Sequence, residues 1–205
     1  MLWNQFQILP ADRVMGPEGT SRPGDWQLRI LRFTEELMWN AILWGQLGAA
    51  IDMLENAIAA CPDELWSDPS GKPGWRRKDV VGFWYVAYHT LFFLDLQLSG
   101  STDGFAPPAP FDLRELDPEG LLPERPYTKE EVQAYLRHCR EKARNTIAAL
   151  TEEATRRPCR WGSFELPFAE LLVYGMRHVQ HHAGQLNRLL RQNVDAAPRW
   201  VKRAQ

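Results

Sequence analysis

The sequence has few cysteines, no excess of positive charge and no long apolar run. Its three cysteines are Cys61, Cys139 and Cys159, and none of them forms part of a CxxC pair. An odd number of widely spaced cysteines argues against a disulfide framework and a thiolate zinc site, and it favours a reducing cytoplasm. The formal net charge of −2 leaves no dominant basic surface, so no nucleic-acid partner is expected.

Signals for export, membrane insertion and several common enzyme classes are also missing. Residues 1–25 contain no basic segment followed by an apolar run. No apolar run approaches the roughly 20 residues that cross a bilayer. The sequence has no GxSxG, P-loop, HExxH or glycine-rich dinucleotide turn, which argues against the reactions built on those motifs. We therefore expect a cytoplasmic protein with no membrane partner.

The composition itself is that of one globular domain. Hydrophobic residues make up 44% of the 205 residues and charged residues make up 24%. This is enough apolar material for a sizeable core. Nine tryptophans and nine phenylalanines indicate bulky packing and are consistent with a pocket lined by aromatic side chains.

Four long segments have the periodicity of amphipathic or buried helices. They span residues 26–60, 77–99, 129–153 and 167–192. Thr128 and Glu131 form a capping box in front of the third segment. Proline and glycine mark the connections at residues 61–78, 100–127 and 156–166. The sequence thus predicts an all-α fold, a four-helix bundle with long connecting loops and a topology other than simple up-down-up-down.

The chain is expected to divide into an irregular lead-in, a single bundle domain and a tail, at residues 1–25, 26–193 and 194–205. Gly45 and Gly48 weaken the first helix, and we expect a neighbouring helix to approach it closely there. The tail carries Trp200 and Val201, which are expected to pack back on the bundle.

Three of the five histidines lie in the fourth helical segment. On a wheel of 100° per residue with Val179 at zero, His182 falls at about −60°, inside the apolar arc. His178 falls at about −100°, on the border of that arc, and His181 falls at about 200°, on the charged face. His178 and His182 are therefore predicted to face the interior at i,i+4 spacing, where two imidazoles can bind one metal ion.

His89 lies in the middle of the second helical segment. An isolated histidine on an apolar helix is more often a hydrogen-bonded core residue than a metal ligand. Burying the two imidazoles of the fourth helix removes them from water, which costs free energy unless a partner compensates. A divalent metal ion that His89 also binds would be such a partner. From the residues alone, a three-histidine metal site and a buried polar network of histidines stay equally open.

The remaining polar side chains on the helices are interpreted mainly as surface groups. We interpret His138 as exposed, Asp95 as a helix-surface residue and Glu170 as a solvated carboxylate. Gln185 falls at about −120° on the wheel, one turn from the histidine pair. There it can orient a ligand from behind or equally face the solvent.

The histidine pattern resembles that of the DinB-like (YfiT/DinB) superfamily of bacterial metal-binding four-helix bundles. The resemblance rests on His89 in YHTLFFLDLQ and on the H-x-x-x-H of RHVQHHAGQLNRLLRQ, which Ala, Gly and Gln follow. It implies a divalent metal site of His89, His178 and His182, with nickel or zinc as the occupant, and a homodimer. The long lead-in and the proline-rich loop at residues 100–127 depart from the family pattern, so they leave the substrate and the oligomer open.

Three neutral imidazoles leave a divalent ion with at least one open position, as in catalytic zinc sites. Such an ion can lower the pKa of bound water to about 7, or hold a thiol as its thiolate. The resemblance favours an enzyme that transfers a low-molecular-weight thiol to a small electrophilic substrate. The alternatives are a hydrolase that uses metal-bound hydroxide and a non-enzymatic metal-binding or stress-related bundle.

Overall fold

The computed structural model describes residues 25–66, 82–161 and 164–204, and gives side chains for 38–66, 82–160 and 165–204. The predicted lead-in falls almost wholly outside the described residues. The chain forms two compact units, Met1–Thr34 and Glu35–Gln205. The second unit contains every side chain discussed below and all of the bundle except residues 25–34 of its first helix.

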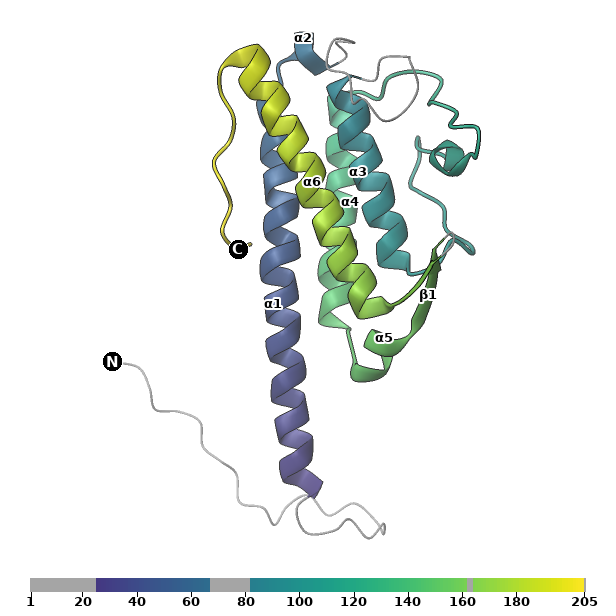
Figure 1. Ribbon diagram of the computed structural model, residues 1–205, viewed down its shortest axis with the longest axis vertical. Helices are drawn as coiled ribbons and strands as arrows, with labels where there is room; N and C mark the ends of the chain where they lie inside the picture. The colour runs from purple at the N-terminus through teal and green to yellow at the C-terminus, as the bar shows by residue number, and fades with distance from the viewer. Residues whose placement is uncertain (1–24, 67–81, 162–163, 205) are drawn as a thin grey trace, which may run out of the picture. The chain divides into compact units, whose positions relative to one another are not determined.

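The described residues form an all-α bundle, which confirms the predicted fold class (Figure 1). Its long helices are α1 (Asp25–Ala60), α3 (Phe83–Ser99), α4 (Lys129–Ala148) and α6 (Phe168–Val194). The connections hold α2 (Asp63–Trp66), the 3₁₀ helix η2 (Leu113–Leu116), α5 (Glu152–Arg156) and the strands β1 (Pro158–Trp161) and β2 (Phe164–Pro167).

The long helices follow one another in the order up, down, down, up. The start of α4 lies at the end of α1, where Lys129 Nζ donates a hydrogen bond of 2.7 Å to the Asp63 carboxylate. The start of α6 lies at the end of α3, because Gly100, the C-cap of α3, lies against Phe168. α3 and α4 are therefore parallel, and the loop between them has to return along the bundle, as Figure 1 shows. This return is the physical reason for the long proline-rich connection.

α3 lies at the centre of the core. All its residues except Phe93 and Ser99 are buried, as its nearly continuous apolar sequence predicts. Leucine and isoleucine side chains of α1, α4 and α6 belong to the same core. Within the described part of the chain, no helix is both long and apolar enough to cross a membrane.

Asp95 is only 1% exposed, so its interpretation as a helix-surface residue is wrong. Its carboxylate accepts hydrogen bonds from Lys142 Nζ at 2.5 Å and from the Tyr135 hydroxyl at 2.9 Å. His138 Nε2 lies 3.4 Å from the same group, while the His138 side chain stays exposed as expected. The partners of Asp95 come from α4, so the sequence of its own helix gives no sign of them. Glu170 is exposed, as predicted.

Several boundaries differ from the sequence prediction. The helix that was expected to reach about residue 153 ends at Ala148, because Thr151 caps a separate helix, α5. The connection after α5 contains the antiparallel pair β1 and β2, in which Cys159 lies opposite Leu166. Two strands of four residues are too short to give a clear alternating pattern. α3 begins at Phe83 after the N-cap Gly82, and the predicted helical turn at residues 77–81 lies outside the described residues.

The C-terminal tail, rather than a neighbouring helix, covers the two glycines of α1. The Ala204 amide donates a hydrogen bond of 2.9 Å to the Gly45 carbonyl. A Cβ atom at Gly48 would lie 2.6 Å from the Cβ atom of Ala204, so only glycine leaves the tail this much room. Val201 packs on the core as expected, whereas Trp200 remains 65% exposed.

Candidate metal centre

Three histidine rings meet between α3 and α6. His89 comes from the middle of α3, and His178 and His182 come from successive turns of α6. The Nε2 atom of His178 lies 3.1 Å from that of His182 and 3.4 Å from that of His89. One ligand nitrogen of each ring lies within 4.8 Å of the other two. The structure therefore brings together the three residues named from the sequence, in an arrangement that could hold a metal ion.

Glu115 holds the outer side of His89. Its Oε1 atom lies 2.5 Å from His89 Nδ1, and the Tyr85 hydroxyl donates to the two carboxylate oxygens at 3.0 and 3.1 Å. Glu115 is only 2% exposed and belongs to η2, in the long loop between α3 and α4. Sequence reasoning missed it, because nothing in the sequence distinguishes it from other acidic residues of the loop, such as Asp117 and Glu119.

Gln185 holds the outer side of His182. Its Oε1 atom lies 2.8 Å from His182 Nδ1, and its Nε2 atom lies 2.9 Å from His181 Nε2. The carboxamide thus connects an inward histidine to the exposed His181 on the next face of α6. Of the two interpretations of Gln185, this geometry corresponds to a residue that orients a ligand from behind.

The two inward histidines of α6, His178 and His182, are neutral at physiological pH. Burial lowers the pKa of His178 to about 2, and the nearby rings of His182 and His89 add to this effect. Burial also lowers the pKa of His182 to about 4, with His89 adding to the effect and the hydrogen bond to Gln185 opposing it. Metal ions bind neutral imidazole, so no proton has to leave these two rings before binding.

The outer hydrogen bonds determine which nitrogens carry hydrogen. A carboxylate and an amide oxygen only accept hydrogen bonds, so the Nδ1 atoms of His89 and His182 are the donors. In the neutral form, which is the form that binds metal, their Nε2 atoms present lone pairs toward His178. The His178 ring can supply at most one hydrogen at Nε2, so the three nitrogens cannot all satisfy one another. A cation at their meeting point would satisfy all three, so the residues fit a divalent metal.

A pocket of about 500 Å³ opens onto the three histidines. Its other lining residues are Phe93, Gln97, Tyr174 and His181. The Phe93 ring lies edge-on to His89, with 4.7 Å between the ring centroids. An ion held by the histidines would therefore be reachable by a small molecule from one side and bordered by an aromatic wall on another.

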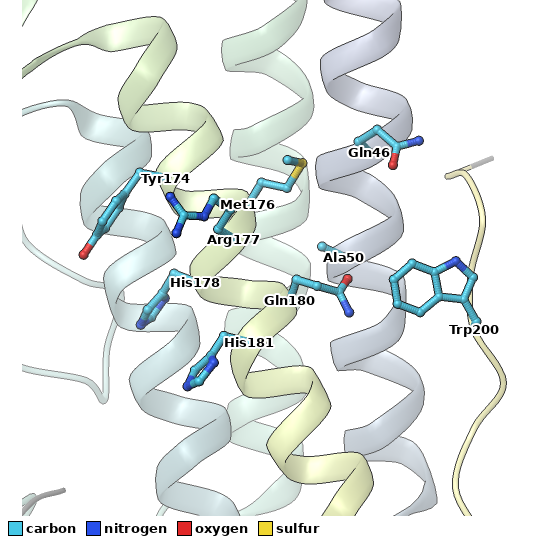
Figure 2. A pocket seen from close by; sticks show the side chains of 9 residues that line it. All are labelled: Gln46, Ala50, Tyr174, Met176, Arg177, His178, Gln180, His181 and Trp200. Carbon is cyan, nitrogen blue, oxygen red and sulfur yellow. The ribbon is translucent and has the colours of Figure 1, made fainter.

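A second pocket of about 600 Å³ shares Tyr174, His178 and His181 with the first. It lies between α6, α1 and the C-terminal tail. Figure 2 shows Trp200 at one end of it and the two histidines at the other, with Gln180 between them. Of the three clustered histidines, only His178 borders both pockets.

Comparison with known proteins agrees with the resemblance seen in the sequence. The sequence profile of the DinB superfamily matches residues 46–186, a stretch that includes all three histidines of the cluster. A solved structure similar to this one is the crystal structure of a DinB-like protein, YjoA, from Bacillus subtilis. The two are 16% identical with a TM-score of 0.49, over 80% of this chain and 96% of that chain. No curated protein matches the sequence. Because the profile covers more than half of the chain, the protein belongs to the DinB superfamily.

Proposed function

We propose that this protein is a metal-dependent enzyme that transfers a low-molecular-weight thiol to a small electrophile. His89, His178 and His182 hold the metal ion in this proposal, with nickel or zinc as the occupant. One observation carries it: three Nε2 atoms converge at a pocket, with the outer nitrogens of two rings held by Glu115 and Gln185.

The metal supplies an open coordination position and favours the thiolate form of a thiol bound there. The protein's residues orient the site and compensate its charge. Glu115 would align His89 and hold a buried carboxylate behind that ring, and Gln185 would align His182. Phe93 borders the histidines with an apolar surface that limits access of water from its side.

The proposed transfer needs no oxidant or reductant. The thiol loses its proton to solvent, and its sulfur forms a bond to the electrophilic carbon. The leaving group departs with the electron pair of the bond that breaks. For an electrophile that carries chloride, the products are a thioether, a chloride ion and a proton.

The thiol has to come from outside the protein. Cys61, Cys139 and Cys159 are all buried, and none of them lines either pocket. Burial raises the pKa of Cys61 to about 12 and raises the pKa of Cys139 well above its ordinary value, so both stay protonated. Their chemistry is therefore that of core residues, and a small thiol that enters the pocket is the nucleophile.

Three features of the proposal come from the family resemblance or from availability rather than from geometry. They are the choice of thiol transfer over hydrolysis, the identity of the metal and the homodimer. The affinity order of divalent ions places copper above nickel and zinc, so the metal available in the cell decides the occupant. The homodimer expected for this family is also a proposal, and sedimentation equilibrium of the purified protein measures it directly.

The test follows the loss of free cysteine in the presence of monochlorobimane, with the zinc-loaded and nickel-loaded proteins. We expect metal-dependent loss of thiol that a chelator abolishes and that His178→Ala removes. Thiol loss that is unchanged by chelation would overturn the transferase proposal. Ester hydrolysis by the same loaded protein, with no thiol transfer, would replace it with the hydrolase alternative. Bound metal with neither activity would support the non-enzymatic bundle.

A further inference from the structure

Gln97 is a buried polar residue in the wall of the histidine pocket. It lies on α3, eight residues after His89, which is about 12 Å along the helix axis. Its side chain is only 2% exposed, and its Oε1 atom has no hydrogen-bond partner among the described residues. A buried acceptor that is left unsatisfied destabilises the protein. This Oε1 atom lies against Gly175, so the flexible carboxamide has to turn toward the pocket before a group that enters there can hydrogen-bond it.

The side chain of Gln97 packs against α6 at Gly175, where any larger residue would collide with it. A Cβ atom at Gly175 would lie 2.7 Å from Gln97 Oε1, closer than any real contact of that kind. Gly175 precedes His178 by three residues on α6. The same pair of helices therefore places the histidines at one level and Gln97 against a glycine that lies about one turn of α6 from His178 and about two turns from His182.

The surface between these two levels is aromatic. Phe93 lies midway between His89 and Gln97 on α3, and its ring lies against both His89 and His178. Tyr174 lines the same pocket and is partly exposed at its mouth. A molecule that extends from the histidines to Gln97 therefore passes along an apolar wall before it meets a polar group.

We propose that Gln97 determines specificity by hydrogen-bonding the far end of the small molecule that binds the metal. This inference rests on the proposed metal site and adds the ligand class. The ligand has a metal-binding atom at one end and a short apolar middle. At its other end it carries an N–H or O–H donor, as in an amide, which satisfies Gln97 Oε1.

The test measures binding to zinc-loaded protein by calorimetry, with two series of hydroxamates that have the same chain lengths. One series ends in a carboxamide and the other in a methyl group, so only the first can hydrogen-bond Gln97. We expect a chain length at which the carboxamide binds 5–10-fold more tightly than its methyl counterpart, about the value of one hydrogen bond. In Gln97→Met this preference disappears, while the methyl series still binds. Equal affinities at every length, or an unchanged preference in Gln97→Met, would overturn the proposal.

Two further variants distinguish a specific loss of the carboxamide preference from a loss of folding. In Gly175→Ala the new methyl group displaces the flexible end of Gln97, so we expect a weaker preference for carboxamides in a protein that still binds zinc. Gln180→Met is the matched control, because Gln180 lines only the second pocket, and it should keep the full preference. A protein that binds no zinc would overturn the proposed metal site and this inference together. Zinc-loaded protein that binds both series equally would overturn the role of Gln97 alone.

Discussion

The Oε1 atom of Glu115 lies 2.5 Å from the Nδ1 atom of His89, and this contact joins the long proline-rich loop to the centre of the bundle. The parallel order of α3 and α4 requires a long return, and η2 within that return carries the carboxylate inward. A carboxylate behind a histidine fixes the hydrogen on Nδ1 and makes Nε2 a better ligand. The loop is therefore part of the proposed site and not only a connection.

Glu115→Gln is expected to weaken zinc binding by about 10–100-fold, because it removes the negative charge behind His89 but keeps the side-chain size. Competition with a chromophoric chelator measures the affinity. Glu119→Gln is the control, since Glu119 is exposed in the same loop, and it should bind zinc like the wild type. Wild-type affinity in Glu115→Gln would show that this carboxylate does not support the site.

The metal-free protein is expected to lose stability as the pH falls from about 7 to about 5. His178 and His182 have folded-state pKa values of about 2 and about 4, below the ordinary value of 6.5 that applies to the unfolded chain. In this range the unfolded chain binds protons at both positions and the folded chain does not, so the free energy of unfolding decreases. Each histidine contributes about 2 kcal/mol to the decrease.

Denaturant titrations in the presence of a chelator, at several pH values, measure this dependence. The double variant of His178→Ala and His182→Ala should show a clearly smaller slope, because it lacks the two buried imidazoles. An equal slope in the wild type and the double variant would mean that other groups cause the acid sensitivity.

Asp95→Asn is expected to destabilise the fold by about 3 kcal/mol, since it leaves Lys142 without its buried counter-charge. Zinc affinity should remain unchanged, because Asp95 contacts α4 rather than the histidine pocket. Thermal and chemical unfolding measure the first effect and chelator competition measures the second. Glu141→Gln on the exposed side of α4 is the matched control. If Asp95→Asn were as stable as the wild type but bound zinc more weakly, both expectations for Asp95 would be contradicted.

Two glycine substitutions should have different effects. Gly184→Ala has open space around its new methyl group, so we expect a gain of up to about 1 kcal/mol in stability from the higher helix propensity of alanine.

Gly48→Ala would bring its methyl group against Ala204 and displace the tail. Hydrogen exchange should then show loss of protection at the Ala204 amide, which bonds to Gly45 in the wild type. A protected Ala204 amide in Gly48→Ala would contradict this packing.

The sequence predicts the parts of this fold that have strong local signals. The period of the apolar residues is sufficient to find the long helices, and Thr128 with Glu131 marks the start of α4 by a capping box that the structure confirms. The convergence of His178 and His182 also follows from local geometry, because residues four apart on a helix share a face. Only their meeting with His89 needs the tertiary structure.

The features that the sequence did not predict depend on partners far away in the chain. Glu115 meets His89 across a loop, Asp95 is buried because Lys142 and Tyr135 lie opposite it, and Gly48 faces the tail. Each of these contacts joins segments whose own sequence patterns carry no information about the other. Helix periodicity can place a side chain on a face, but it does not identify the residue that the face meets.

The metal content of the purified protein tests the central claim most directly. Elemental analysis of the wild type should find close to one divalent ion per chain. His89→Ala, His178→Ala and His182→Ala should each lose it, and His181→Ala should retain it, because His181 is exposed beside the cluster. Equal metal content in all four variants, or a wild-type protein that binds no metal even after loading with zinc or nickel, would contradict the assignment of this site.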